Sequence, residues 1–446
     1  MNTPDTGSDF MGGFVVDELA CTRRHLRIAV VTETWPPEIN GVALTLSRLV
    51  EGLRARDHTL QLIRPRQPAE TGGAALAPAS AGQDAMDLLT GGVPIPRYPH
   101  MRMGLPATRG LIKRWSLQRP DVVHIATEGP LGWSAVRAAQ RLMLPTVSDF
   151  RTNFHDYSRH SGVGWLRKPI VAYLRKFHNR TVCTTVPTYQ LKAQLEASGF
   201  ERLQVIPRGV DLQRFNPCHR SAALRSRWGA DDDMPVMLCV SRLAAEKSLL
   251  ELVDAYRAAR SEGIRCKLVM VGDGPMLPEL QARCPEAHFA GLQRGLDLSR
   301  HYASADLFAF PSQTETFGNV VIEAMASGVA VVAYRHAAAG EWLQHGHSAW
   351  LAEPGNALDF RKQVLRALVS PADRRIRAES ARAIAHELDW PQVVDQFEGV
   401  LADAAASAAA PRLAQRAHNQ PEPSTSVAPR PVSSTTLSSP TRSPSA

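Results

Sequence analysis

Short, uninterrupted apolar runs alternate with amphipathic segments along most of the chain. Residues 28–31 form one such run, and Leu46, Leu49, Val50 and Leu53 follow it at spacings of three and four. A continuous apolar run is typical of a parallel strand that is covered on both faces. Spacings of three and four place apolar side chains on one face of a helix. The chain is therefore predicted to start with a strand, a loop and an amphipathic helix.

The same alternation continues in two series. Further predicted strands of the first series lie at 121–126, 145–150 and 180–186, and those of the second at 235–241, 266–272, 287–291, 306–312 and 329–334. Two series of strands with helices between them predict two doubly wound parallel-sheet domains. The segment 68–92 is rich in Ala, Gly and Pro, so it is predicted to be a surface loop.

These patterns divide the chain into segments. We expect a loose arm at 1–25, one domain at 26–215, a second at 216–389, a helix at 390–407 and a disordered tail at 408–446. The tail is predicted to be disordered because its Pro, Ser and Thr residues offer little apolar surface to offset the entropy of ordering.

Composition agrees with a soluble protein of two domains. The chain has 446 residues, of which 44% are hydrophobic and 21% charged, and this length exceeds one ordinary core. The 6 cysteines stand singly, without a CxxC pair, which argues against a zinc site or a disulfide framework. We expect a cytoplasmic protein, because the start lacks signal-peptide features and no apolar run nears the roughly 18 residues of a membrane span.

The formal net charge of +8 favours anionic partners. Nucleic acid, acidic lipid and phosphorylated substrates are all candidates, and a solvated basic surface is the simpler alternative. No helix-turn-helix or aromatic-and-basic RNA motif stands out, so we expect no nucleic-acid partner.

Two loops after predicted strands carry candidate phosphate-binding groups, since ligands of open α/β sheets bind beyond the carboxyl ends of the strands. In the first, 35–46, Gly41 lets the backbone approach a ligand closely at a helix start, which attracts anions. In the second, 241–256, Arg242 and Lys247 are well placed to neutralise a diphosphate. An ordinary turn and a solvated helix start remain the structural alternatives.

A third loop, "AFPSQTETFGNVVIEAMASGV" at 309–329, places Glu315 before a predicted helix start at Gly318-Asn319 and Glu323 after it. Carboxylates accept hydrogen bonds from vicinal hydroxyls, so the pair suggests a sugar and a ribose on either side of a diphosphate. Glu323 alone could compensate the helix dipole. That alternative does not explain Glu315, which precedes the helix.

These motifs in combination resemble the signature loops of glycosyltransferase family 4. They are "SRLAAEK" (241–247), "VGDGP" (271–275) and "ETFGNVVIEAMASG" (315–328). The start "TETWPPEINGVALTL" (32–46) resembles the branch of sulfoquinovosyl-diacylglycerol synthases and bacterial GDP-mannose-dependent α-mannosyltransferases. The resemblance covers about residues 26–405. It implies a retaining enzyme of the α/β GT-B fold, in which two Rossmann-like doubly wound parallel-sheet domains face a cleft.

The resemblance also implies a role for each matching residue. Arg242 and Lys247 would bind the donor diphosphate, Glu315 the hydroxyls of the transferred sugar, and Glu323 the ribose. Backbone amides would assist at Phe317, Gly318 and Asn319, and Gly41 would face the diphosphate from the first domain. The helix from Trp390 would cross back onto that domain.

Two positions depart from the family pattern. Arg151 stands where a histidine that faces the donor sugar is usual, and Arg208 stands where asparagine is common. Either Arg151 or His155, on the acceptor side, would take over the role of that histidine. The catalytic candidates are therefore Arg242, Lys247, Glu315 and Arg151.

The expected mechanism follows from charge. Cleavage of the anomeric bond builds negative charge on the leaving diphosphate, and fixed cations there stabilise the transition state more than the ground state. We expect no metal or other cofactor, because the sequence offers no convincing Asp-x-Asp loop. Asp231-Asp232-Asp233 lies in a polar connection. Retention is implied by the resemblance, and attack on the same face, assisted by a phosphate oxygen of the donor, is the expected route.

The acceptor is expected to be a lipid or a lipid-linked molecule. The stretch 157–195 mixes basic and aromatic residues and contains no acidic residue, since the flanking carboxylates are Asp156 and Glu196. Such a composition is typical of a helix on an anionic membrane, here the inner face of the plasma membrane, although packing on the domain is the alternative. We thus expect transfer of a mannose- or glucose-type hexose from a GDP- or UDP-sugar. The alternatives are transfer to a soluble glycan and a nucleotide-sugar epimerase of the same fold.

Overall fold

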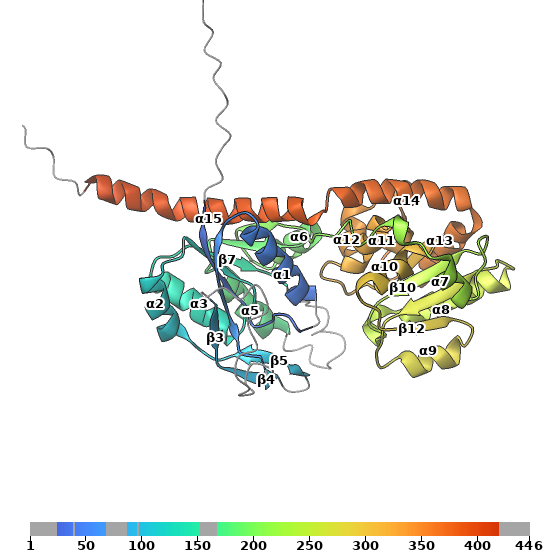
Figure 1. Cartoon of the computed structure of the whole chain (residues 1–446), viewed down its shortest axis with the longest axis horizontal. Helices are drawn as coiled ribbons and strands as arrows, with labels where there is room; N and C mark the ends of the chain where they lie inside the picture. The colour runs from blue at the N-terminus through green and yellow to red at the C-terminus, as the bar shows by residue number, and fades with distance from the viewer. Residues whose placement is uncertain (1–24, 39–40, 68–86, 96–97, 152–166, 419–446) are drawn as a thin grey trace, which may run out of the picture.

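The computed structural model describes residues 25–38, 41–67, 87–95, 98–151 and 167–418. Two α/β domains lie side by side, and a long helix runs from the second across the first (Figure 1). This is the two-domain architecture predicted from the sequence, with each domain built on its own parallel sheet.

The first domain is built on a seven-stranded sheet with the strand order β3-β2-β1-β6-β7-β8-β9, and each neighbouring pair is parallel. Its strands are β1 (Arg27–Val31), β2 (Thr59–Pro65), β3 (Leu88–Thr90), β6 (Val122–Ile125), β7 (Thr146–Asp149), β8 (Cys183–Val186) and β9 (Leu203–Val205). Its helices are α1 (Gly41–Arg54), α2 (Thr108–Leu117), α3 (Pro130–Arg141), α5 (Arg167–His178) and α6 (Tyr189–Ala197). An antiparallel pair, β4 (Gly92–Ile95) and β5 (Tyr98–Gly104), lies beside them.

Alternate residues of β1 pack in the hydrophobic clusters on opposite faces of this sheet. Ile28 and Val30 pack in the cluster that includes α1, and Ala29 and Val31 pack in the cluster that includes α2 and α3. The uninterrupted apolar run therefore reflects a strand that is covered on both sides.

The second domain is built on a six-stranded parallel sheet with the order β12-β11-β10-β13-β14-β15. Its strands are β10 (Val236–Val240), β11 (Lys267–Val271), β12 (His288–Gly291), β13 (Leu307–Phe310), β14 (Ala330–Tyr334) and β15 (Trp350–Ala352). Its helices are α7 (Ala222–Arg227), α8 (Leu249–Ser261), α9 (Leu277–Arg283), α10 (Gly295–Ala303), α11 (Asn319–Ala326), α12 (Ala337–Trp342), α13 (Ala357–Val369) and α14 (Pro371–His386), with short 3₁₀ turns η3 (Pro217–His219) and η4 (Ala245–Lys247).

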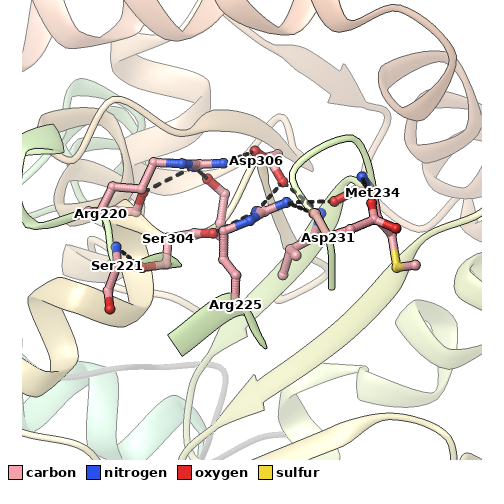
Figure 2. Close-up of polar contacts among 10 residues, drawn as sticks. Arg220, Ser221, Arg225, Asp231, Met234, Ser304 and Asp306 are labelled. Carbon is pink, nitrogen blue, oxygen red and sulfur yellow. Dashed lines mark hydrogen bonds and ion pairs between the residues drawn. The ribbon is translucent and has the colours of Figure 1, made fainter. Parts of the chain in front are cut away.

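A buried ionic network ties α7 to the start of β13 (Figure 2). The Arg225 guanidinium donates to the Asp306 carboxylate at 2.8 Å and to the Ser304 carbonyl at 2.9 Å. It also donates to the carbonyls of Asp231 and Met234 at 2.7 and 2.8 Å. Because a buried guanidinium is costly unless its donors are satisfied, the four contacts of its two terminal nitrogens fix α7 against the domain.

The long helix α15 (Trp390–His418) returns to the first domain (Figure 1). Val393, Val394 and Phe397 are buried in the same cluster as β1 and α1. The close approach depends on Gly52 of α1, where a Cβ would lie 2.6 Å from a methyl group of Val394. The helix thus joins the two domains by packing as well as by covalent connection.

Two predictions about segment ends were wrong. The predicted loop at 68–92 extends too far, because Leu88–Thr90 pairs with β2 as strand β3. The predicted tail at 408 starts too early, because α15 continues to His418. Ala has the highest intrinsic helix propensity, and the Ala-rich segment 404–410 carries the helix past residue 408. Residues 1–24, 68–86 and 419–446 lie outside the described residues.

Candidate active site

A cleft of about 480 Å³ lies between the two domains, at the carboxyl ends of the strands. It is large enough for a nucleotide-sized ligand. The predicted site residues that line it are Gly41 and Arg151 from the first domain and Arg242, Lys247, Glu315, Phe317, Gly318 and Asn319 from the second. The structure therefore brings together loops that are far apart in the sequence.

Lys247 and Glu315 form an ion pair in this cleft. The Lys247 ammonium donates to Oε1 of Glu315 at 2.5 Å, and the Ser312 hydroxyl donates to the same oxygen at 2.8 Å. Lys247 lies in η4 after β10, and Glu315 lies in the loop after β13. They meet because β10 and β13 are neighbours in the sheet. Both side chains are mostly buried, so each holds the other in position within the cleft.

Arg242 is held more loosely. Its guanidinium pairs with Glu246, four residues along, and its side chain remains 58% exposed. The Thr314 hydroxyl fixes this turn by donating to the Glu246 carbonyl at 3.0 Å. An exposed ion pair contributes little to stability. The guanidinium can therefore turn towards an anion in the cleft at small cost.

The start of α11 faces the same cleft. Gly318 precedes the helix with φ 91°, in the left-handed region that glycine tolerates best, and the helix starts where the sequence predicted it. Phe317 is buried, and its carbonyl accepts a hydrogen bond from the Ala338 amide at 2.7 Å, which fixes the turn. The first amides of a helix lack partners within it, so this end of α11 offers donors to an anion.

Glu323 lies on α11 but does not line the cleft as the structure describes it. Its Oε2 accepts a hydrogen bond from the Tyr302 hydroxyl of α10 at 2.9 Å. Burial raises the pKa of Glu323, whereas the Tyr302 hydrogen bond and the charge of Arg214 oppose that shift. Burial and the adjacent carboxylate raise the pKa of Tyr302 well above its ordinary value. The ribose role of Glu323 stays a prediction.

The first domain presents Arg151 at the end of β7. Arg151 pairs with Asp149, which also lies 3.9 Å from Nε2 of His124. Burial lowers the pKa of His124 to about 4, so the imidazole is neutral near pH 7. Because it pairs with Asp149, Arg151 lies on the cleft wall as a paired cation. His155, the alternative candidate, lies outside the described residues.

Sequence reasoning noted Arg208 only as a departure and gave it no role, yet it lines the cleft. Its guanidinium donates a long hydrogen bond of 3.4 Å to the Asn319 side chain and lies 5.9 Å from the centre of the Phe317 ring. Burial lowers the pKa of Arg208 to about 10, and the nearby Arg151 acts in the same direction. Arg208 thus bridges the two domains. Its place in the "PRGVD" loop after a strand was the available signal.

Comparison with known proteins identifies the family. Residues 39–214 match the model described as Glycosyltransferase Family 4, and residues 234–370 match the model described as Glycosyl transferases group 1. A GDP-mannose-dependent alpha-mannosyltransferase of Mycobacterium tuberculosis is 32% identical, with 84% of this chain and 96% of that protein covered. The chain belongs to glycosyltransferase family 4.

Two further relatives and one solved structure are also similar to this chain. The Arabidopsis thaliana sulfoquinovosyl transferase SQD2 is 31% identical over 67% of this chain and 59% of its own length. A GDP-mannose-dependent alpha-(1-6)-phosphatidylinositol monomannoside mannosyltransferase of Mycobacterium tuberculosis is 29% identical, with 80% of this chain and 92% of that protein covered. The structure of sucrose-phosphate synthase from Thermosynechococcus elongatus superposes with a TM-score of 0.69 at 18% identity, covering 86% of this chain and 100% of that one.

Family 4 membership confirms the GT-B fold and the predicted resemblance, including its mannosyltransferase and sulfoquinovosyl branch. The protein is a glycosyltransferase, which argues against the epimerase alternative. Among the described residues, no helix is long and apolar enough to cross a membrane. No group of three or more potential metal-ligating side chains gathers in that part of the chain either.

Proposed function

We propose that this enzyme transfers a mannosyl group from GDP-mannose, with retention of the anomeric configuration, to a lipid or lipid-linked acceptor. The observation that carries the proposal is the similarity to a GDP-mannose-dependent alpha-mannosyltransferase across 96% of that relative's length. A second relative is named for a phosphatidylinositol mannoside acceptor, which supports the acceptor class.

In this proposal, Lys247, Arg242 and the start of α11 hold the donor diphosphate. All three lie on one wall of the cleft. As the anomeric bond breaks, negative charge grows on the leaving phosphate oxygen, and positive charges already fixed there lower the barrier without having to reorganise. These groups supply the charge that a metal ion provides elsewhere, so we propose that transfer is metal-independent.

Glu315 holds hydroxyls of the transferred sugar. Its Oε1 already receives Lys247 and Ser312, so the carboxylate orientation is set before the donor binds. The ion pair also places the sugar site directly beside the diphosphate site. Attack by the acceptor on the face that the diphosphate leaves, with a donor phosphate oxygen taking the proton, gives retention without a covalent enzyme intermediate.

Arg151 and Arg208 of the first domain line the same cleft. Arg151 lies where the family places a histidine, and its pairing with Asp149 keeps it rigid. We assign Arg151 to the sugar hydroxyls and Arg208 to closure of the domains, since Arg208 contacts Asn319 across the cleft.

The acceptor side includes a basic helix that suits an anionic membrane. On α5, Leu174 and Phe177 are buried, whereas Lys168, Arg175 and Lys176 are exposed. The helix thus packs its apolar side on the domain, which is the packing alternative, and its exposed cations support the proposed membrane contact. We propose that the enzyme works peripherally at the inner face of the plasma membrane. Residues 157–166 of the basic stretch lie outside the described residues.

A donor panel tests this proposal. Purified enzyme receives radiolabelled GDP-mannose, GDP-fucose, UDP-glucose or UDP-galactose with membrane lipid extract, and label is measured in the organic phase. We expect mannose to enter the lipid fraction in buffer with EDTA. Transfer from a UDP-sugar alone would overturn the donor assignment, and label confined to soluble oligosaccharide would overturn the acceptor class.

A further inference from the structure

A second cavity, of about 440 Å³, lies in the second domain away from the donor cleft. Helices α7 and α10 and the edge strand β12 form its walls. Its lining includes the basic, amide and aromatic side chains of Arg227, Trp228, His288, Gln293, Arg300 and His301. None of the predicted donor-binding residues lines it, so the site needs a separate explanation.

Positive groups outnumber negative ones around this cavity. Arg227 and Arg300 line it, and Asp297 pairs with Arg300 at 3.2 Å. Burial lowers the pKa of His288, and the charges of Lys267, His301 and Arg227 lower it further. Burial also lowers the pKa of His301, with Arg227 adding to the shift and Asp297 opposing it. The two arginines outnumber the single carboxylate, so the side chains around the pocket favour a bound negative charge.

Trp228 forms a buried aromatic part of the pocket wall. Trp228 is 2% exposed, and its indole N–H has no hydrogen-bond acceptor among the described residues. The ring lies 5.5 Å from that of His301 and 6.5 Å from that of His288. The indole nitrogen is itself closed to solvent, so a ligand in the pocket meets the ring of Trp228 and not its N–H.

His301 also lines the pocket and offers a ring nitrogen to a ligand bound there. Its Nδ1 lies 2.7 Å from the Asp297 carbonyl and donates to it in the neutral ring. The other nitrogen, Nε2, is then an acceptor that becomes a donor when the ring gains a proton. An anion in the pocket would hold that proton and bind more tightly in return.

The walls are fixed before any ligand arrives. Helix α7 carries Arg227 and Leu224 on the pocket, and its Arg225 is locked to Asp306 and neighbouring carbonyls (Figure 2). The helix start is capped by the Ser221 hydroxyl, which accepts from the Leu224 amide at 3.2 Å. A rigid, preformed pocket loses little entropy on binding.

We propose that this pocket is an effector site for a small organic phosphate with a ring-sized carbon skeleton. The guanidinium groups of Arg227 and Arg300 and the imidazoles bind the phosphate, since planar guanidinium groups match phosphate oxygens. Trp228, Leu224 and Ala290 give the carbon skeleton an apolar wall.

The site is coupled to the donor cleft through α10. Tyr302 follows His301 in sequence, and its hydroxyl holds Glu323, the predicted ribose carboxylate. A ligand that draws α10 towards the pocket moves the group that positions Glu323. Occupancy of the pocket is therefore expected to change the affinity for the donor.

Isothermal titration with phenyl phosphate tests the site on the full-length protein. Arg227 and Arg300 are both exposed, so Arg227→Gln with Arg300→Gln should preserve the fold. We expect the double variant to bind phenyl phosphate at least about tenfold more weakly, because charge-assisted hydrogen bonds are lost.

Two controls make the result decisive. Arg283→Gln removes a similarly exposed arginine with a similar local ion pair on α9, and Lys247→Ala weakens the donor cleft. Both should bind phenyl phosphate as the wild type does. No binding by the wild type, equal binding by the double variant, or loss in Lys247→Ala would overturn the proposal. The last result would assign the phosphate to the donor cleft and leave the glycosyltransferase function intact.

Discussion

At the residue scale, the contact between Lys247 and Glu315 joins the two halves of the donor site. The ammonium lies where the diphosphate is expected, and the carboxylate lies where the sugar is expected. Their spacing lets one ion pair position both groups. Removing either partner would leave the other charge partly buried and uncompensated.

Lys247→Ala should lower kcat/KM roughly a hundredfold, a loss of about 3 kcal/mol of transition-state stabilisation. This loss is expected when one fixed positive charge beside the developing anion is removed. Initial rates with GDP-mannose measure this effect. Lys362→Ala, which removes an exposed lysine of α13, is the matched control and should leave the rate unchanged. A loss of similar size in both variants would contradict the role of Lys247.

Glu323→Gln should raise the donor KM and change kcat little, because ribose contacts are shared by the ground and transition states. The Tyr302 hydroxyl can still donate to the amide oxygen of the new side chain, so α10 and α11 should keep their packing. Steady-state kinetics separate the two constants. A large fall in kcat at unchanged KM would contradict the ribose assignment.

The same variant has an expected effect on stability. Burial raises the pKa of Glu323 above 4.5, so the folded protein holds this proton more tightly than the unfolded chain. Ionisation of Glu323 therefore reduces stability as the pH rises from about 4.5 through the folded pKa. At pH 7, Glu323→Gln should have a Tm equal to or above that of the wild type, and this advantage should disappear near pH 4. A lower Tm at pH 7 than the wild type would contradict the raised pKa.

Candidate site residues could be predicted from the sequence where they belong to one contiguous motif. Arg242 and Lys247 share one loop, and Glu315 and Gly318 share another, so local spacing carried the information. The pairing of Arg151 with Asp149 and the reach of Arg208 to Asn319 depend on how distant loops meet. Such contacts are set by domain packing, which one sequence does not reveal.

At the element scale, helices α1 and α15 show how a glycine sets an interface. Gly52→Ala places a methyl group 2.6 Å from a methyl group of Val394, so the helices must separate. Overpacking of this kind costs about 1–3 kcal/mol. Chemical denaturation should show this loss.

Gly399→Ala on α15 is the matched control. A Cβ at this position meets nothing within 4 Å, so the variant should be stabilised by up to about 1 kcal/mol through helix propensity alone. Equal stability of the two variants would contradict the proposed packing of α15 on α1.

Strands were predictable to within a few residues where the run was apolar, as in β10 and β14. Short strands without such a run, β3 and β15, were missed because three residues give no periodic pattern. The end of α15 was misplaced because Pro411 and the polar residues after it predict the end of a helix, whereas the helix continues through them to His418.

At the scale of the whole molecule, the basic side of α5 should direct binding to anionic membranes. Each Lys or Arg near such a surface contributes about 1 kcal/mol, an effect that salt screens. Sedimentation with vesicles of phosphatidylglycerol and phosphatidylcholine should increase with phosphatidylglycerol content and decrease with salt. Reversal of Lys168, Arg175 and Lys176 to Glu should abolish it.

The control carries the same change of charge elsewhere. Reversal of Arg361, Lys362 and Arg366 on α13, which are exposed, should leave vesicle binding nearly intact. Equal loss in both variants would mean that net charge alone governs binding and would contradict a specific role for α5.

The central claim is retaining transfer of mannose from GDP-mannose by groups gathered in one cleft. GDP-mannose labelled with ¹³C at the anomeric carbon, supplied with enzyme, acceptor lipid and EDTA, tests it directly by NMR of the product. The account predicts a lipid product whose labelled carbon keeps the α configuration and whose formation Lys247→Ala suppresses. A β-linked product, a requirement for added metal, or a labelled nucleotide sugar with an altered sugar and no transfer would contradict it.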